Sequence, residues 1–431
     1  MPRPGVLEVT RISVYLPTTR RYPYSMPWAI RTLLTISAVA LPLYLYVGLR
    51  SAGSIGLLHP ETKRRARRIV FLLIGWLYCF PLIIVISHTF GGSAGRLELV
   101  SAGSVADYLF LYPQWIGLII VLELTAPFLL LEVAGLAGRF VPARLPRWRR
   151  VLAYGRLALV VAVIAYVPVR VVLDTTRVQD TTVEVRLKDL PLELQDFRIT
   201  LVGDIQVDRY TGESKIAQVH EIVHKRSPEL LLSSGDVVTG GTDYLDEAKK
   251  AMCGIKGSLA SMAVVGDHDY WSAPEAIRAF QESCGWAFLE NEHSLLLWKG
   301  KRILITGLTH VYSQRLNETR LDDIMDRAPE ADVRILLVHQ PAEWLIRLAA
   351  ERGYSIVVAG HTHGGQIVFH PLGFPLTPSM RETKFYSGTY SLGSTAVVVT
   401  DGVGLTLAPV RYHAPAEVTT IVLQSASGAF K

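Results

Sequence analysis

Carboxylates, imidazoles and one amide follow five apolar runs between residue 197 and residue 358 of this 431-residue chain. The clusters consist of Asp204 with Gln206, Asp236, Asp267 with His268 and Asp269, His339, and His361 with His363. Imidazole nitrogens and carboxylate oxygens bind divalent metals such as zinc, manganese and iron. These residue types therefore predict a metal site, provided that the fold brings the five clusters together.

The last cluster has the densest local pattern. The apolar run 354–358 leads into Ala-Gly-His-Thr-His-Gly-Gly-Gln at 359–366. Such a run predicts a buried strand, and the glycines predict a tight loop at its end. Two histidines in a loop are often non-catalytic. By itself, this motif is therefore compatible both with a metal site and with a non-catalytic loop.

The elements that position the clusters alternate between strands and helices. We expect strands near 183–187, 197–202, 229–233, 262–265, 294–298, 302–306, 333–338 and 354–358, and helices near 213–225, 242–255 and 273–282. This order predicts an α/β domain, and ligands of open α/β sheets bind just outside the carboxyl ends of the strands. One Asp after a Gly can simply cap a helix. Five clusters at strand ends favour a convergent metal site instead.

The first half of the chain predicts a membrane anchor over residues 1–174. Four apolar segments lie near 28–49, 69–87, 110–134 and 151–173. Each approaches the length of about 20 residues that a helix needs to cross a bilayer. The first segment has a long preceding arm and three further spans behind it, unlike a signal peptide. Pro127 marks a possible break in the third span.

Basic residues predict the orientation of this anchor. They concentrate between spans one and two and between spans three and four, as Arg50, Lys63, Arg64, Arg65, Arg67, Arg68, Arg139, Arg144, Arg147, Arg149 and Arg150, whereas the middle loop holds only Arg96. Positive loops stay cytoplasmic, so the soluble domain is expected outside the inner membrane of the cell. Arg3, Arg11, Arg20 and Arg21 favour the opposite orientation.

The formal charge of +6 does not indicate a nucleic-acid partner, because the basic residues flank apolar segments. The expected partner is a lipid bilayer. Glu123 and Glu132 lie in the third span, where a carboxylate is a functional candidate by default. The alternative is that both are paired structural residues. Cys253 and Cys284 are the two cysteines that could pair, although their spacing does not require it.

The ordered clusters resemble the motifs of the calcineurin-like metallophosphoesterases. They are Gly-Asp-Ile-Gln at 203–206, Gly-Asp at 235–236, Gly-Asp-His-Asp at 266–269, Val-His at 338–339 and Gly-His-Thr-His at 360–363. The loop at 360–366 and the tail segments 386–388, 401–404 and 409–411 resemble a membrane-associated bacterial branch. The resemblance covers about 195–424, with a linker and first strand at 175–194 and a tail at 425–431. It implies an α/β/β/α sandwich with two mixed sheets and two metals at the strand ends.

The resemblance also implies roles for individual residues. Asp204 and His363 would ligate the first metal, together with Gln206. Asp236 would bridge both ions, and Asp267, His339 and His361 would complete the second site. His268 would act on the substrate phosphate or the leaving group, and Asp269 would orient His268.

Two positions depart from the family pattern. The family usually has His where this chain has Gln206, and Asn where it has Asp267. Both changes favour oxygen ligation, so manganese is the expected ion among manganese, iron, zinc and magnesium. Gln206 also predicts a weaker first metal site. A one-metal or inactive descendant is the alternative.

Other candidates have weaker signals. Tyr270, Trp271, His310 and Tyr312 are possible substrate contacts or local packing residues, Arg381 and Lys384 are possible phosphate contacts or solvated loop charges, and His370 and His413 are expected to be structural.

The sequence thus predicts a membrane-anchored phosphoesterase acting on phosphomonoesters or phosphodiesters, with lipid-linked or envelope substrates favoured. A non-catalytic metal sensor, or an accessory domain of a scaffold or transporter, is the alternative. The substrate and the oligomeric state stay open.

Overall fold

The computed structural model describes residues 28–90, 105–137 and 145–426. Its amino-terminal part is helical, with α1 (Trp28–Leu58), η1 (Pro60–Thr62), α2 (Lys63–Leu77), α3 (Cys79–Phe90), η3 (Asp107–Leu111), α4 (Tyr112–Ala137) and α5 (Leu145–Thr176). Four stretches are long and apolar enough to cross a membrane: Ala29–Leu58, Pro60–Thr89, Asp107–Leu136 and Leu145–Thr176. The four expected apolar helices are therefore confirmed, and each is longer than the sequence suggested. The amino-terminal basic arm, Arg96, Arg139 and Arg144 lie outside the described residues.

The third span is one continuous helix. Pro127 lies inside α4, so the possible break at this position does not occur. The second span is interrupted instead, at Tyr78 between α2 and α3. A proline in a helix removes one backbone donor, and apolar packing keeps α4 intact here: Leu124 and Phe128, on either side of Pro127, are buried in the helical core.

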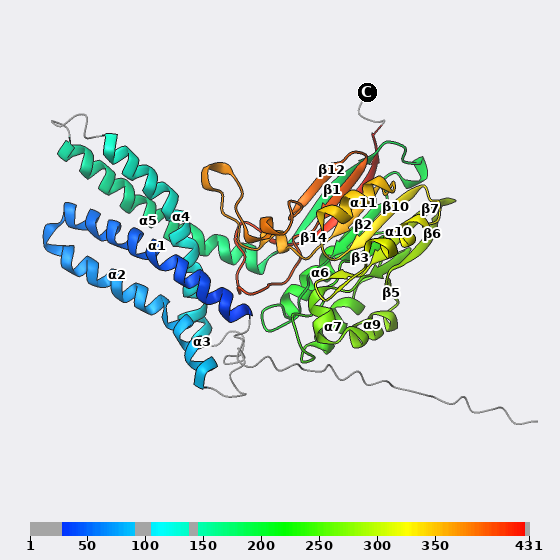
Figure 1. Cartoon of the computed structure of the whole chain (residues 1–431), viewed down its shortest axis with the longest axis horizontal. Helices are drawn as coiled ribbons and strands as arrows, with labels where there is room; N and C mark the ends of the chain where they lie inside the picture. Colours follow the sequence, from blue (N-terminus) through cyan, green and yellow to red (C-terminus); the bar gives the residue numbers. More distant parts are fainter. Residues whose placement is uncertain (1–27, 91–104, 138–144, 427–431) are drawn as a thin grey trace, which may run out of the picture.

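The helices pack side by side at one end of the molecule (Figure 1). Their apolar outer faces stay exposed, for example at Leu72, Val133 and Val161. An exposed apolar band of this extent is typical of helices that contact lipid. Glu132 is paired inside the helical region, with Arg156 at 2.9 Å and Arg50 at 3.2 Å. This carboxylate is therefore part of a structural ion-pair group.

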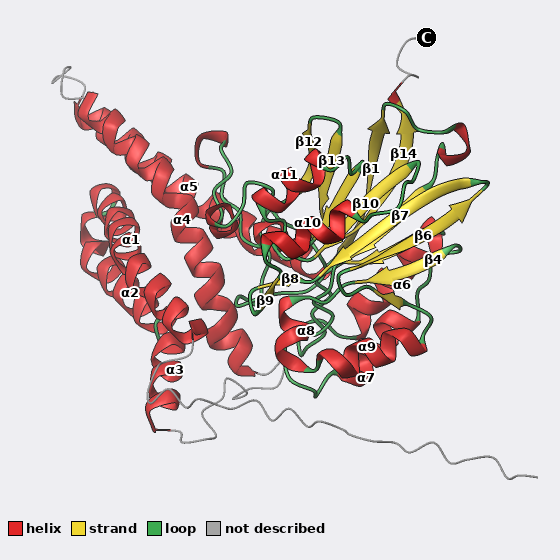
Figure 2. Ribbon diagram, turned by 45° about the vertical axis from the view of Figure 1, so that its right-hand side comes forward, coloured by secondary structure: helices red, strands yellow, loops and turns green. Residues whose placement is uncertain are grey.

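Two six-stranded mixed sheets form the second part (Figure 2). The first has the order β1-β14-β2-β3-β4-β5, and the second has the order β12-β13-β11-β10-β7-β6. Their bounds are β1 (Val178–Leu187), β2 (Arg198–Val202), β3 (Leu230–Ser233), β4 (Ala260–Ala263), β5 (Ala287–Phe288), β6 (Glu292–Trp298), β7 (Lys301–Leu308), β10 (Val333–Val338), β11 (Ile356–Ala359), β12 (Gly388–Leu392), β13 (Thr395–Val399) and β14 (Ala416–Ser425). A separate two-stranded sheet contains β8 (His310–Val311) and β9 (Gln314–Arg315). The expected pair of mixed sheets is confirmed.

Apolar side chains bury the sheets from both sides. One core cluster joins the two sheets through residues such as Leu201, Leu232, Ile305 and Ile335. Helices α6 (Glu213–Arg226), α7 (Leu245–Cys253) and α9 (Pro274–Ser283) carry a second cluster against the first sheet. Helices α10 (Glu318–Asp326) and α11 (Glu343–Glu351) carry another against the second sheet. Central strands such as β3 are buried at every position because both of their faces are covered. Cys253 and Cys284 form a disulfide, with their Cα atoms 5.1 Å apart.

The boundary between anchor and domain is short, because the expected first strand begins near the start of the segment 175–194. Helix α5 extends to Thr176, and β1 begins at Val178. Strand β1 pairs in parallel with β14 over its whole length, from Val178 with Ala416 to Leu187 with Ser425. Strand β1 is therefore an edge strand of the first sheet, and only Arg177 separates it from the last membrane helix.

The segment 408–413 joins the two parts of the molecule. Ala408, Val410 and Tyr412 belong to the same apolar cluster as the membrane helices. The Tyr412 hydroxyl donates a hydrogen bond of 2.9 Å to Oε1 of Glu123. The backbone N–H of His413 donates to Asp174 at 2.7 Å. The anchor is thus packed directly against the domain, and Glu123 has a domain partner.

Candidate metal centre

The two sheets contribute different ligand types to one site. Asp204, Asp236 and Asp267 follow β2, β3 and β4 of the first sheet. His339 follows β10, and His361 and His363 follow β11 of the second sheet. Because the carboxyl ends of these strands meet at one edge of the sandwich, carboxylates face imidazoles there. All the expected metal ligands, including Gln206, lie at this edge.

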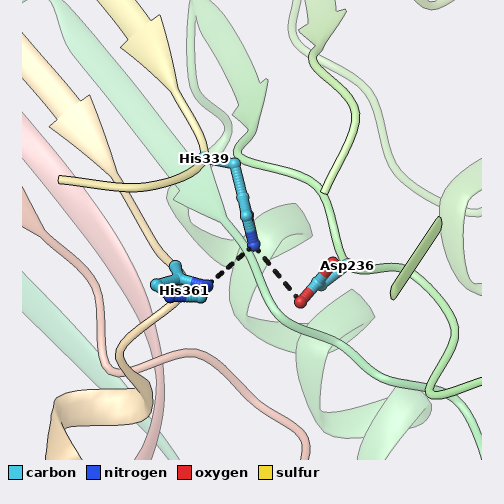
Figure 3. A group of neighbouring side chains, drawn as sticks. All are labelled: Asp236, His339 and His361. Atoms are coloured by element: carbon cyan, nitrogen blue, oxygen red, sulfur yellow. Dashed lines mark hydrogen bonds and ion pairs between the residues drawn. The ribbon is translucent and has the colours of Figure 1, made fainter. Parts of the chain in front are cut away.

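The tightest group consists of Asp236, His339 and His361, whose ligand atoms lie within 4.8 Å of one another (Figure 3). Nε2 of His339 lies 3.3 Å from Oδ2 of Asp236 and 3.2 Å from Nδ1 of His361. Asp267 completes the group, since its Oδ2 lies 3.1 Å from Nδ1 of His361 and 3.4 Å from Nε2 of His339. These four residues are the ones expected at the second ion.

The group expected at the first ion is more open. Nε2 of His363 lies 3.8 Å from Oδ1 of Asp204. The amide of Gln206 donates a hydrogen bond of 3.3 Å to Oδ2 of Asp236. Its Oε1 is buried and has no hydrogen-bond partner among the described residues. A buried carbonyl oxygen without a partner is costly, and a cation would satisfy it.

The backbone is strained at the expected ligands. Five of them have positive φ angles, namely Asp204 at 48°, Gln206 at 45°, Asp236 at 56°, His361 at 72° and His363 at 52°. Such angles are uncommon outside glycine and cluster at functional sites. The glycines beside them also give space: a Cβ atom on Gly266 would clash with Oδ1 of Asp236, and one on Gly360 would clash with Oδ2 of Asp204. The local structure is therefore built around the carboxylates.

Outer hydrogen bonds fix the imidazole rings. Nδ1 of His339 lies 2.8 Å from the carbonyl oxygen of Ser234, which leaves Nε2 for the cluster. Nε2 of His361 lies 3.1 Å from Oε1 of Glu382, which also accepts a hydrogen bond from Tyr312 at 2.6 Å. Metal-binding histidines usually have such a partner on the second nitrogen. No sequence signal pointed to Glu382, because a single acid in a loop belongs to no motif.

The fully buried guanidinium of Arg411 organises the first-ion side. Arg411 donates to the carbonyl oxygens of Asp401, Gly402 and Gly404, and its Nη2 lies 3.3 Å from Nδ1 of His363. Burial and the neighbouring Arg411 hold the pKa of His363 well below its usual range. The ring is therefore neutral, as a metal ligand must be.

The electrostatics of the cluster fit divalent cations. Burial, with Asp236 adding to the effect, raises the pKa of Asp204 to about 6. Although burial opposes it, hydrogen bonds and charge from His339 and His361 hold the pKa of Asp267 well below its usual range. Three buried carboxylates in one group are expensive without a counter-charge. Together with the unpartnered Gln206 oxygen, they make a donor set that suits metal ions.

His268 lies at the cluster, whereas Asp269 has a different role from the one expected. The backbone N–H of His268 donates a hydrogen bond of 2.8 Å to Oδ1 of Asp236, and Nδ1 of the His268 ring lies 2.5 Å from the carbonyl oxygen of Thr239. The buried Asp269 carboxylate accepts from the N–H groups of Val237, Val238 and Gly266. The expectation that Asp269 orients His268 is therefore wrong: Thr239 holds the ring, and Asp269 holds the Asp236 loop.

The weaker candidates separate into packing and cavity residues. Tyr270 packs on the apolar core of the first sheet. His310 lines a second cavity of about 650 Å³, which Arg315 and Arg381 also line. Burial, with Arg315 adding to the effect, lowers the pKa of His310 to about 4. Nζ of Lys384 lies 3.8 Å from Oε2 of Glu343, and both side chains are exposed to solvent. Lys384 is therefore a solvated loop charge.

The cluster opens into a cavity of about 560 Å³. Asp236, Asp267, His361 and His363 line one side, with the stacked rings of Trp271 and Tyr312 beside them. Thr32 and Ile36 of α1 and Trp115 of α4 line the other side. These three residues were missed, because no motif connects a membrane helix with a distant strand end.

A family model supplies the decisive comparison. The model for calcineurin-like phosphoesterases matches residues 197–365. The chain carries a calcineurin-like metallophosphoesterase domain. The matched region includes all the expected metal ligands, and the amino-terminal helices lie outside this region.

Curated relatives of this metallophosphoesterase domain include membrane proteins. The chain is 29% identical over 258 residues to a zebrafish (Danio rerio) protein named transmembrane protein with metallophosphoesterase domain, covering 57% of each chain. It is 24% identical over 257 residues to the uncharacterized metallophosphoesterase YkuE of Bacillus subtilis, covering 59% of this chain and 88% of that one. The chain thus spans little more than half the length of the zebrafish relative. With the four apolar helices, that relative's name indicates a membrane protein.

Among solved structures, the 5′-nucleotidase precursor of Thermus thermophilus is 14% identical, with a TM-score of 0.34. The match covers 53% of this chain and 54% of that one.

Proposed function

We propose that the chain is a membrane-anchored phosphoesterase that hydrolyses phosphomonoester or phosphodiester bonds with the help of two divalent metal ions. The observation that carries the proposal is the convergence of buried carboxylates and imidazoles from two sheets, on strained backbone, inside a calcineurin-like domain. Placing the site against membrane helices favours lipid-linked or envelope phosphoesters as substrates.

The donor set divides into two groups that share Asp236. One ion would be held by Asp204, Gln206, Asp236 and His363, and the other by Asp236, Asp267, His339 and His361. When bound, such a pair of ions supplies an acidified water for attack and a positive field for the phosphoryl oxygens. The oxygen-rich composition favours manganese, and the amide of Gln206 predicts weaker binding at the first position.

His268 is the proposed acid–base residue. A carbonyl oxygen only accepts hydrogen bonds, so Nδ1 of His268 carries the proton that points to Thr239. This leaves Nε2 free to hold or release a proton beside the cluster, and His268 lines the same cavity as Asp236. Protonation of the leaving oxygen is the step that this geometry supports.

The test is hydrolysis of bis(4-nitrophenyl) phosphate by the full-length protein in detergent micelles with Mn²⁺. We expect Asp236→Asn to lower kcat/KM on the order of a thousandfold, because the shared carboxylate is lost. Asp243→Asn, in an exposed loop, is the matched control and should keep the wild-type rate. Equal rates in the wild type and Asp236→Asn would refute the assignment.

A non-catalytic metal sensor is the second candidate. The amide of Gln206 already satisfies one oxygen of Asp236, an arrangement that weakens the first-ion group. Stoichiometric Mn²⁺ binding without turnover of any phosphoester would favour this candidate. A transporter role has less support, because Glu123 and Glu132 both have structural partners.

We further propose that the domain faces away from the cytoplasm, across the inner membrane. Basic residues gather at the starts of α2 and α5, which lie at the helix ends away from the domain. The disulfide between Cys253 and Cys284 supports the same placement, since disulfides persist in oxidising compartments. Reporters fused after Lys431 test it: activity of a cytoplasm-specific reporter alone would reverse the orientation.

A further inference from the structure

Helices of the membrane anchor form part of the wall of the cavity beside the metal cluster, the group of Asp and His side chains proposed to bind metal. Ile36 of α1 and Trp115 of α4 lie within stretches that are long enough to cross a bilayer. They line the same cavity as Asp236 and His361. Leu407 and Ala408, from the segment that joins domain and anchor, complete this apolar side. A molecule bound at the cluster is therefore in reach of the membrane part of the protein.

A second hollow extends the apolar wall. It measures about 300 Å³ and shares Trp115, His268, Leu407 and Ala408 with the first cavity. From there it is lined by Ile30 and Leu33 of α1, Phe80 of α3 and Leu111 of η3, and on the domain side also by the polar residues Asp208, Arg209 and Tyr210. Apolar space next to a charged cluster is unfavourable when it holds water, and an alkyl chain that fills it is stabilised by the burial of its CH₂ groups.

A neighbouring loop places this cavity near lipid. The loop that supplies Pro378 and Ser379 to the cavity wall also exposes Leu372, Phe374 and Leu376. It stays close to α5, because its residue His370 contacts His413, whose Nε2 lies 2.7 Å from the hydroxyl of Tyr166. Figure 1 shows the loop beside α4 and α5, away from the sheets. An apolar loop tip next to membrane helices is typical of contact with a bilayer.

We propose that the site takes an amphiphilic phosphoester, in which the phosphate lies at the metal cluster and a long alkyl or acyl chain lies between α1, α4 and Leu407. This inference rests on the proposed phosphoesterase function and names its substrate class. The reaction is hydrolysis: water adds to phosphorus, the bond from phosphorus to the leaving oxygen breaks, and that oxygen leaves as an alcohol or phenolate. Ile36 and Leu407 determine chain specificity.

Two chromogenic diesters test the proposal with the full-length protein in detergent micelles and Mn²⁺. The probes are 4-nitrophenyl ethyl phosphate and 4-nitrophenyl dodecyl phosphate, which release the same 4-nitrophenolate. We expect the wild type to prefer the dodecyl ester by about tenfold or more in kcat/KM, because only its chain fills the apolar cavity. The double variant Ile36→Ser with Leu407→Ser should lower this ratio about fivefold or more.

A matched control removes the effect of micelles. Leu297→Ser changes an exposed leucine of β6 outside the cavity, so its ratio should equal that of the wild type. All variants meet the same micelles, and partitioning of the dodecyl ester therefore cancels between them. A ratio near one in the wild type, or a ratio that the double variant leaves unchanged, would overturn the proposal.

Binding of dodecyl phosphonate and ethyl phosphonate, whose P–C bonds are not hydrolysed, separates the two levels of inference. Tighter binding of the dodecyl compound that depends on Ile36 and Leu407, without turnover of either ester, supports the apolar subsite and contradicts the phosphoesterase. Turnover with equal binding of both phosphonates supports the phosphoesterase and overturns the amphiphilic substrate.

Discussion

The hydroxyl of Tyr412 donates a hydrogen bond of 2.9 Å to the carboxylate of Glu123, and thereby links the metallophosphoesterase domain to the third membrane span. Tyr412 is fully buried, and its ring packs against Tyr166 of α5 and Phe369 of the domain. A carboxylate within a membrane span is costly unless it is paired. Glu123 is therefore a structural partner of the domain, and this contact holds the helical wall beside the metal cluster.

A double-mutant cycle on this contact should give a coupling energy. Tyr412→Phe and Glu123→Leu each remove the hydrogen bond, and each should lower the apparent Tm, at a cost of about 1–3 kcal/mol. The double variant should cost less than the sum, since it leaves no unpaired partner. Thermal unfolding in detergent measures all four proteins. Strict additivity would show that the contact contributes nothing to stability.

Replacement of Gln206 by His should strengthen the first-ion group. An imidazole is a better ligand than an amide oxygen for manganese, iron or zinc, and we expect the weaker Kd for Mn²⁺ to fall about tenfold. Elemental analysis after dialysis should show a stoichiometry closer to two ions per chain. Gln179→His, on an exposed position of β1, serves as the control and should change neither value. Unchanged binding in Gln206→His would argue against a first site here.

Metal removal should destabilise the domain. The carboxylates of Asp204, Asp236 and Asp267 are buried in one group, so chelation leaves only the neighbouring imidazoles to offset their repulsion. Ligand binding at 100 times Kd stabilises a fold by about 2.7 kcal/mol, which corresponds to roughly 5–10 °C in apparent Tm for a domain of this size. Dialysis against EDTA followed by Mn²⁺ addition measures the shift. An apparent Tm that changes neither with EDTA nor with Mn²⁺ would exclude a metal centre in this cluster.

His268 and Asp269 should separate in their effects, although they are neighbours. His268→Gln removes the proposed proton donor, so we expect kcat to fall about 10²–10⁴-fold while Mn²⁺ content and Tm stay unchanged. Asp269→Asn should instead lower Tm, because its carboxylate accepts three backbone hydrogen bonds around Asp236. Elemental analysis, kinetics and thermal unfolding of both variants make the comparison. The reverse pattern would restore Asp269 to a direct catalytic role.

Lys215 should make stability depend on pH. Burial, with the neighbouring charge of Arg411 adding to the effect, lowers the pKa of Lys215 from 10.5 to about 7, while Asp208 opposes the shift. Between these values the unfolded chain binds a proton that the folded chain does not, so stability rises with pH, by at most about 1.4 kcal/mol per unit. Below about pH 7 both states are protonated, and the penalty of burying the charge is fully present.

Lys215→Met removes this titration, because it keeps an apolar stem of similar length without the ammonium group. In EDTA, its apparent Tm should exceed that of the wild type at pH 7, and the difference should shrink toward pH 9. Parallel melting curves over this range measure the effect. A constant difference would mean that Lys215 keeps its usual pKa in the folded protein.

The sequence by itself determined the elements and their chemistry. Apolar runs of membrane length specified the four spans, since a helix that crosses a bilayer has no other composition available. The Gly-Asp and Gly-His motifs at the ends of apolar runs specified which side chains form the cluster, because only small residues allow those carboxylates to approach the backbone. Even the departures at Gln206 and Asp267 were visible from the residues alone.

Only the tertiary structure decided how these parts meet. The partner of Glu123 is 289 residues away in the chain, and Glu382 and Thr239 reach the cluster from loops without any motif. The segment 409–411 did not indicate that Arg411 would contact His363. Local sequence patterns report periodicity and turns, whereas these contacts depend on how two sheets and a helical bundle pack. For the same reason the sequence assigned the wrong role to Asp269, and it contained no sign that α1 and α4 form one wall of the cavity at the metal cluster.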